Sequence, residues 1–281
     1  MLALPQVATK MENTLKLTFG HSPCPNDTFM FYALSSGRMD LPGHNLSVEL
    51  HDVETLNMMA MHAELDMTKL SFHAWLHVRE HYRLIESGAA LGYGCGPLLI
   101  SRRPLNKNDI SGCRIALPGE WTTAHLLFRL WSPTSGERFH VRYDRIFDAI
   151  DSGEADCGVI IHESRFTFEQ AGFHKVVDLG AWWEDETGLP IPLGCIAIRE
   201  TISDRTRLEL DGLIRNSIAY AHEHPGEMLP YVRQYAQEMT DDVLRAHIRT
   251  FVNEFSLDMG GTGHSAIAEL EKMARQAGLI S

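Results

Sequence analysis

The sequence lacks the features that mark membrane proteins and nucleic-acid-binding proteins. No stretch approaches the ~18 consecutive apolar residues of a membrane-spanning helix, and no run is rich in Lys and Arg, as phosphate-backbone binding requires. The 25 Lys and Arg residues are outnumbered by 37 Asp and Glu residues, which gives a formal net charge of −12. We therefore expect neither a membrane nor a nucleic acid as partner. The oligomeric state stays open.

Cysteine is scarce, and the five cysteines lie far apart in the chain. No two of them form the C-x-x-C pair of zinc and redox sites; they are Cys24, Cys95, Cys113, Cys157 and Cys195. Free and mostly buried thiols in the reducing cytoplasm are the simplest interpretation. Residues 1–14 also lack the charged start and apolar stretch of a secretion signal. We expect them to form a loose N-terminal leader.

Glycine-rich phosphate-binding loops are missing as well, but the pattern of an α/β protein is clear. Short apolar or alternating segments that predict strands are followed by segments with helical spacing. This order predicts mixed, mostly parallel sheets flanked by helices. It occurs once before residue 100 and again after residue 112, and a helical region follows from residue 204. We expect two lobes with a ligand cleft between them, 15–100 together with 199–281 and 101–198.

The apolar run Cys157–Ile161 ends on His162. In open α/β sheets, ligands bind at the carboxyl ends of strands, which is where this histidine would lie. Histidine has an ordinary pKa near 6.5, so it can take up a proton near neutral pH. Judged by spacing alone, a histidine that only caps the strand or the next helix is an equal alternative.

Two segments of the first expected lobe carry polar residues after a strand. Ser22–Asn26 contains two prolines, which exclude helix there, and Asn26 or Asp27 could cap the helix that follows. Such a helix start suits an anionic group. The segment Lys69-Leu70-Ser71-Phe72 ends another strand, and its lysine, hydroxyl and aromatic side chains could contact a carboxylate and a ring. A rigid turn and a plain strand end are the respective alternatives.

The second expected lobe offers one more candidate. Thr122 or Thr123 follows a strand and a turn, and is expected to cap a helix. Its hydroxyl and the free backbone N–H groups of the first helical turn would point the same way, an arrangement that suits a carboxylate. Capping alone is the alternative.

Histidines also recur at four-residue spacing, at His73, His77 and His81. They share one helix face, but no glutamate stands in an H-E-x-x-H arrangement and an outside ligand would be needed to complete a metal site. We expect a solvated face.

Five motifs, in the same order along the chain, resemble the 1,4-dihydroxy-6-naphthoate synthase family of the futalosine route to menaquinone. They are Ser22-Pro23-Cys24-Pro25-Asn26-Asp27-Thr28-Phe29, Lys69-Leu70-Ser71-Phe72-His73-Ala74, Gly92-Tyr93-Gly94-Cys95-Gly96-Pro97, Leu117-Pro118-Gly119 with Thr122-Thr123-Ala124, and Gly158-Val159-Ile160-Ile161-His162-Glu163. The resemblance covers roughly residues 15–280.

The resemblance implies a two-lobed type 2 periplasmic-binding-protein-like clamshell that acts as a cytoplasmic enzyme. It implies that cyclic dehypoxanthinyl futalosine is the small-molecule substrate, opened to 1,4-dihydroxy-6-naphthoate with loss of the sugar-derived fragment. The family's proton acceptor falls on His162, and its substrate-binding segments fall on Lys69-Leu70-Ser71 and Thr122-Thr123. We expect Asn26 to be a further substrate-binding residue. The resemblance implies no metal and no organic cofactor.

Two alternatives remain at this point. Chorismate dehydratase, from the start of the same pathway, shares the fold, but the His162 motif and the Ser22–Phe29 loop argue against it. A binding protein that captures a small carboxylate without catalysis is the second alternative. The missing secretion signal argues against that one, and a histidine base would be superfluous in it.

Overall fold

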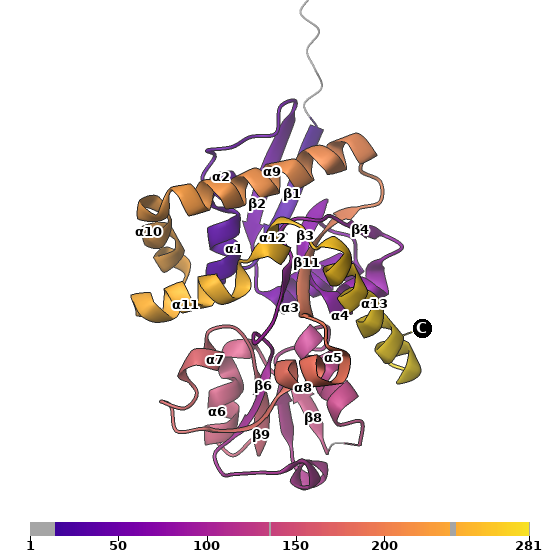
Figure 1. Cartoon of the computed structure of the whole chain (residues 1–281), viewed down its shortest axis with the longest axis vertical. Coiled ribbons are helices and arrows are strands. Elements are labelled where there is room, and N and C mark those ends of the chain that lie inside the picture. Colours follow the sequence, from indigo (N-terminus) through magenta and orange to yellow (C-terminus); the bar gives the residue numbers. More distant parts are fainter. Residues whose placement is uncertain (1–14, 135, 237–239, 281) are drawn as a thin grey trace, which may run out of the picture.

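The computed structural model describes residues 15–134, 136–236 and 240–280. It consists of two lobes stacked along the long axis of the molecule, each built on one β-sheet with helices beside it (Figure 1). The leader expected for residues 1–14 lies outside the described residues.

The first lobe holds a sheet of order β2-β1-β3-β11-β4, with β5 also paired to β11. Its strands are β1 (Leu15–His21), β2 (His44–Leu50), β3 (Met67–Ser71), β4 (Tyr82–Leu84), β5 (Ala90–Gly92) and β11 (Ile191–Arg199). Its helices are α1 (Pro25–Met30), α2 (Tyr32–Ser35), α3 (Val53–Met61), α4 (Phe72–Val78), α9 (Asp204–Glu223), α10 (Pro225–Tyr235), α11 (Asp241–Phe251), α12 (Glu254–Leu257) and α13 (Gly260–Gln276). Strand β3 is buried along its whole length, as a central strand with neighbours on both sides must be.

The second lobe holds a sheet of order β10-β6-β9-β7-β8. Its strands are β6 (Leu98–Ser101), β7 (Ile115–Leu117), β8 (Arg138–His140), β9 (Cys157–Ile160) and β10 (His174–Asp178). Its helices are α5 (Thr123–Trp131), α6 (Ile146–Asp151), α7 (Ser164–Thr167) and α8 (Leu179–Thr187), with 3₁₀ turns η1 (Lys107–Gly112) and η2 (Tyr143–Arg145).

The sheets are mixed, and their antiparallel share is larger than the sequence predicted. β1 runs parallel to β2 and β3, and β7 runs parallel to β8 and β9. The two strands next to the lobe crossings, β6 and β11, run antiparallel to their neighbours. Each of the two strands enters its sheet from the side of the other lobe, so it runs in the direction opposite to the parallel strands of that sheet. By strand pairing, β6 belongs to the second lobe and β11 to the first; the boundaries at residues 100 and 198 stay predictions.

Two local expectations were wrong. Helix α1 begins at Pro25 with Cys24 at its N-cap, so neither Asn26 nor Asp27 caps it. Proline suits the first helical position because the N–H it lacks would have no helical partner there. The second error concerns α4, because His73 is buried and does not lie on a solvated face. Its Nδ1 donates to the backbone oxygen of Thr122 across the two lobes.

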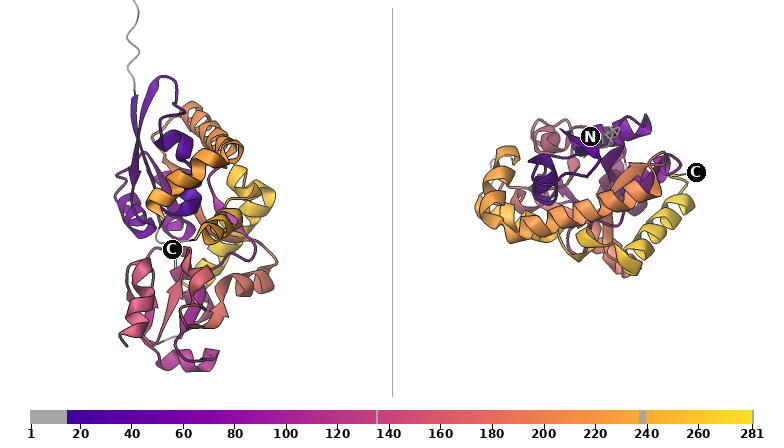
Figure 2. Two further views of the ribbon diagram at one scale, coloured as in Figure 1. Left: turned by 90° about the vertical axis from the view of Figure 1, so that its left-hand side faces the viewer. Right: turned by 90° about the horizontal axis from the view of Figure 1, so that it is seen from above.

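Packing joins the lobes in addition to the chain crossings. One cluster of buried side chains includes Phe72 and Leu91 from the first lobe and Leu127 and Trp183 from the second. Helix α13 also packs on both β11 and α5, and the view from above in Figure 2 shows this yellow helix at the outside of the molecule. The lobes therefore share part of their hydrophobic core.

Buried imidazoles make the stability of this fold depend on pH. Burial lowers the pKa of His73 to about 3 and that of His125 to about 4, from an ordinary value of 6.5. Below about pH 6.5 the unfolded chain therefore binds protons that the folded chain does not. The contribution of these two histidines to stability is fully present above about pH 6.5. It is lost as the pH falls from about 6.5 to about 4 for His125 and to about 3 for His73, by up to ~1.4 kcal/mol per pH unit for each histidine.

We accordingly expect the unfolding midpoint temperature to fall between about pH 7.5 and pH 5. Replacing His125 with glutamine should make this fall shallower, whereas the same replacement at the exposed His81 should leave it unchanged. Thermal unfolding followed by circular dichroism measures both. A midpoint that stays level or rises toward pH 5 would contradict this.

Candidate functional site

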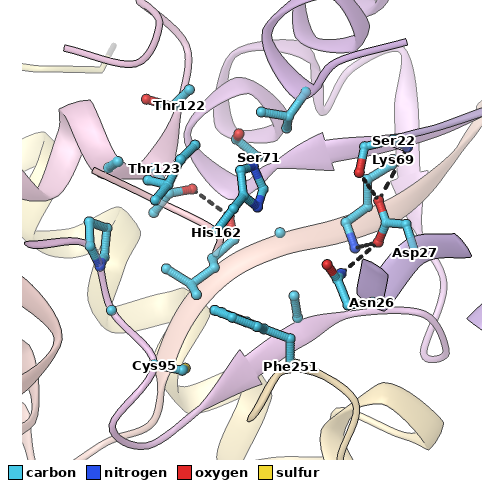
Figure 3. A pocket seen from close by; sticks show the side chains of 18 of the residues that line it. Ser22, Asn26, Asp27, Lys69, Ser71, Cys95, Thr122, Thr123, His162 and Phe251 are labelled. Atoms are coloured by element: carbon cyan, nitrogen blue, oxygen red, sulfur yellow. Dashed lines mark hydrogen bonds and ion pairs between the residues drawn. The ribbon is translucent and has the colours of Figure 1, made fainter. Parts of the chain in front are cut away.

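A cavity lies between the two lobes, and every residue that the sequence suggested for the site lines it. These residues are Asn26, Lys69, Leu70, Ser71, Thr122, Thr123 and His162. The empty space in this cavity, which includes the solvent at its open mouth, is about 700 Å³. Figure 3 shows His162 at the centre, the threonines on one side, and Asn26, Asp27 and Lys69 on the other.

The topology explains why these segments meet. Ser22 and Ser71 stand at the carboxyl ends of the parallel strands β1 and β3, and His162 follows β9 in the other lobe. Loops after parallel strands gather at one edge of a sheet, and here the two edges face each other. The predicted convergence of strand ends is therefore confirmed as an arrangement, while the roles of the residues stay proposals.

His162 has an unusual backbone conformation for its residue type. Its φ is +58°, in the left-handed region that non-glycine residues rarely occupy and that is often found at functional sites. The side chain is half-buried. Its Nε2 lies 3.6 Å from the Cys24 Sγ, and its ring packs edge-on against Tyr143 at 5.0 Å between centroids.

The environment of His162 favours the neutral imidazole. Burial lowers the pKa of His162, and this effect outweighs the opposing influence of the Glu163 and Asp27 carboxylates. At neutral pH the ring therefore has a free lone pair and can accept a proton.

Asp27 and Lys69 form a buried ion pair beside the histidine. The Lys69 Nζ donates to Asp27 Oδ1 at 2.8 Å, and both side chains are almost fully buried. Ser22 donates to the other carboxylate oxygen through its backbone N–H and its hydroxyl, and Asn26 Nδ2 donates to Oδ1. Burial alone would raise the pKa of Asp27, but the Lys69 ammonium and these hydrogen bonds bring it below its usual range.

Ser71 presents a hydrogen-bond donor. Its hydroxyl oxygen accepts from Asn57 Nδ2 at 3.1 Å, while its backbone N–H donates to Asn57 Oδ1 at 2.9 Å. Because Asn57 supplies a proton to the oxygen, the hydroxyl proton of Ser71 is left to donate. An oxygen acceptor on a ligand is the natural partner.

The hydroxyls of Thr122 and Thr123 are engaged by the protein itself. Thr122 donates to the Gly119 carbonyl and caps α5 by accepting from the His125 N–H, which confirms one of the two capping alternatives. Thr123 donates to the Leu193 carbonyl across the lobes. The N–H groups of Thr123 and Ala124 have no acceptor within the helix, so they are the donors of this segment that suit an anion.

Three residues near the cavity were missed by sequence reasoning. Arg165 lines it, donates to the Gly96 carbonyl, and pairs with Asp178 at 2.7 Å. Phe251 lines it from the distant helix α11. His247, one turn earlier on α11, is fully buried behind the wall and donates from Nε2 to Asn26 Oδ1 at 3.0 Å. No local pattern marks these residues; each reaches the site only through tertiary folding.

Within residues 15–134, 136–236 and 240–280, no three His, Cys, Asp or Glu side chains gather in a way that could hold a metal ion. In the same ranges, no helix is both long and apolar enough to cross a membrane.

Comparison with known proteins agrees with this geometry. A sequence profile of the menaquinone biosynthesis family matches residues 17–276. The chain belongs to that family. Together with the two relatives described next, this match confirms the resemblance seen in the five motifs.

Two relatives of this chain are named for an enzymatic activity. The 1,4-dihydroxy-6-naphthoate synthase of Thermus thermophilus is 49% identical over 265 residues, covering 94% of this chain and 96% of that protein. The synthase of the same name from Streptomyces coelicolor is 41% identical over 270 residues, covering 94% of each.

Solved structures confirm the predicted fold class. A crystal structure of an Archaeoglobus fulgidus protein is 34% identical, with a TM-score of 0.90 over 94% of this chain and 98% of that one. The periplasmic aliphatic sulphonate binding protein of Escherichia coli has a TM-score of 0.67 at 10% identity, over 94% and 88% of the two chains. This family member therefore has a periplasmic-binding-protein-like fold.

Proposed function

We propose that this chain is a 1,4-dihydroxy-6-naphthoate synthase, a cytoplasmic carbon–carbon lyase that opens cyclic dehypoxanthinyl futalosine. The observation that carries the proposal is the position of His162, a neutral histidine that faces a cavity lined by the segments that resemble the family motifs. The relatives' names support the same activity.

The walls of the cavity suggest how the substrate is held. Its carboxylate suits the free N–H groups of Thr123 and Ala124, since the start of a helix favours an anion. Its ring suits the apolar wall that includes Pro97, Leu193 and Phe251. The sugar-derived hydroxyls would then face Asn26 on the polar side.

The chemistry requires a base and a means to stabilise negative charge. His162 would accept a proton from carbon, and the electron pair of that C–H bond would form a new double bond of the aromatic ring. The electron pair of the broken carbon–carbon bond would leave with the sugar-derived fragment, which takes up a proton. Negative charge that develops on a substrate oxygen would be stabilised by the Ser71 hydroxyl and the Lys69 ammonium, because fixed donors in a dry site act strongly. Closure of the lobes would exclude water.

Incubation of the purified protein with candidate substrates tests the proposal. We expect cyclic dehypoxanthinyl futalosine to be consumed and 1,4-dihydroxy-6-naphthoate to appear, while chorismate stays unchanged. Liquid chromatography with mass detection follows both. Consumption of chorismate would instead favour the dehydratase. Tight binding of a small carboxylate without turnover of either compound would favour a plain binding protein.

A further inference from the structure

A half-buried carboxylate, Glu54, joins the two lobes outside the catalytic centre. Glu54 lies in the first turn of α3 in the first lobe. Its Oε1 and Oε2 accept from the backbone N–H of Trp121 in the second lobe, at 3.0 and 3.2 Å. Trp121 stands just before the start of α5, where the threonines of the site follow.

The second lobe is shaped to receive this carboxylate. Gly119 has a φ of +139°, and a Cβ placed there would lie 2.6 Å from Glu54 Oε2. Only glycine leaves room for the carboxylate in this backbone conformation. His73 holds the same segment from the first lobe, donating to the Thr122 carbonyl and, through its N–H, to the Thr123 hydroxyl.

Glu54 also reaches into the site through one intermediate residue. Asn57 Nδ2 donates to Glu54 Oε2 at 3.1 Å and to Ser71 Oγ at 3.1 Å. An acceptor at Glu54 thus fixes the Asn57 amide with its NH₂ group toward Ser71. That orientation is what leaves the Ser71 hydroxyl as a donor to the ligand.

We propose that Glu54 is a positioning residue that latches the segment 119–121 of the second lobe to the first and, through Asn57, keeps Ser71 a hydrogen-bond donor in the cleft. The latch favours the closed arrangement, in which the start of α5 and Ser71 face the same cavity. Its effect on turnover rests on the proposed function; its effect on lobe closure does not.

Replacing Glu54 with glutamine is the sharpest test. Glutamine keeps the shape but turns one acceptor into a donor, which then faces the Trp121 N–H or the Asn57 NH₂. In the ligand-free protein the lobes should open. The KM should rise by about tenfold with kcat changed much less, because a ligand must first restore the closed population. The same substitution at Glu64, which is exposed and lies three residues after the end of α3, is the matched control.

Lobe opening is measured as the distance between spin labels on Leu208→Cys in α9 and Asn108→Cys in η1. Both positions are exposed, and all five native cysteines are buried. We expect a longer distance in Glu54→Gln than in Glu64→Gln, with a return to the wild-type distance on adding substrate. Gly119→Ala, which keeps Glu54 but displaces the segment, should open the lobes in the same way.

Equal distances in the Glu54 and Glu64 variants would overturn the proposal, as would a raised KM without a change in distance. If wild-type protein fails to convert the substrate, the proposed function fails, and the ligand-free distances still decide whether Glu54 is a latch.

Discussion

Replacing His162 with asparagine should lower kcat by about 10²–10⁴-fold while leaving the affinity for substrate nearly unchanged, since a general base typically contributes this much. Asparagine is the better replacement because it tolerates the left-handed backbone at φ +58°. His162→Ala serves as a second variant. Both should keep the wild-type circular dichroism spectrum, since the side chain is half-buried and faces the cavity.

Steady-state kinetics and equilibrium binding separate the two effects. Because burial lowers the pKa of His162, the kcat/KM of the wild-type protein should decrease with falling pH only below about pH 6.5. The residual kcat/KM of the variants should not show this decrease. His81→Asn, at an exposed position, is the control. A kcat within a few-fold of wild type in His162→Asn would remove this residue as the base.

Replacing Asp27 with asparagine should destabilise the fold by about 3–5 kcal/mol, because it leaves the Lys69 ammonium buried and unpaired. The carboxylate also accepts from Ser22 and Asn26, so its loss should loosen the polar side of the cavity. Urea unfolding measures the free energy. Acid should act in the same direction, since the pKa of Asp27 is lowered in the folded state and its stabilisation is lost as the pH falls through that value.

An exposed ion pair supplies the matched control for Asp27. Asp151 pairs with Arg102 at the surface, and Asp151→Asn should cost less than about 1 kcal/mol. Adding Lys69→Met to Asp27→Asn should recover part of the lost stability, because the unpaired charge is gone. An equal loss of unfolding free energy in Asp27→Asn and Asp151→Asn would show that the buried ion pair stabilises the fold no more than the exposed one.

Much of the candidate site could be predicted from the sequence, because its residues lie at the ends of strands. His162, Lys69 and Ser71 each end or follow a short apolar segment, and sheet geometry brings such ends together. The motif resemblance added the fold and the activity. A periodicity argument could supply neither, since one fold supports many functions.

The rest depended on contacts that no local pattern contains. Asn26 could not be told from a cap residue, because its partner His247 lies more than 200 positions away. The sequence did not show that the hydroxyls of Thr122 and Thr123 donate to the carbonyls of Gly119 and Leu193. Glu54 was indistinguishable from any other acidic residue in a first helical turn. The antiparallel course of β11 likewise follows from its return across the lobes.

A crystal structure of His162→Asn with cyclic dehypoxanthinyl futalosine is the most direct test of the central claim, that this cleft holds the substrate with its reacting C–H bond against residue 162. We expect the substrate carboxylate at the N–H groups of Thr123 and Ala124, and the reacting carbon beside Asn at position 162. A substrate bound outside the cleft, or one whose reacting carbon faces away from position 162, would contradict the assignment of the base and of the site.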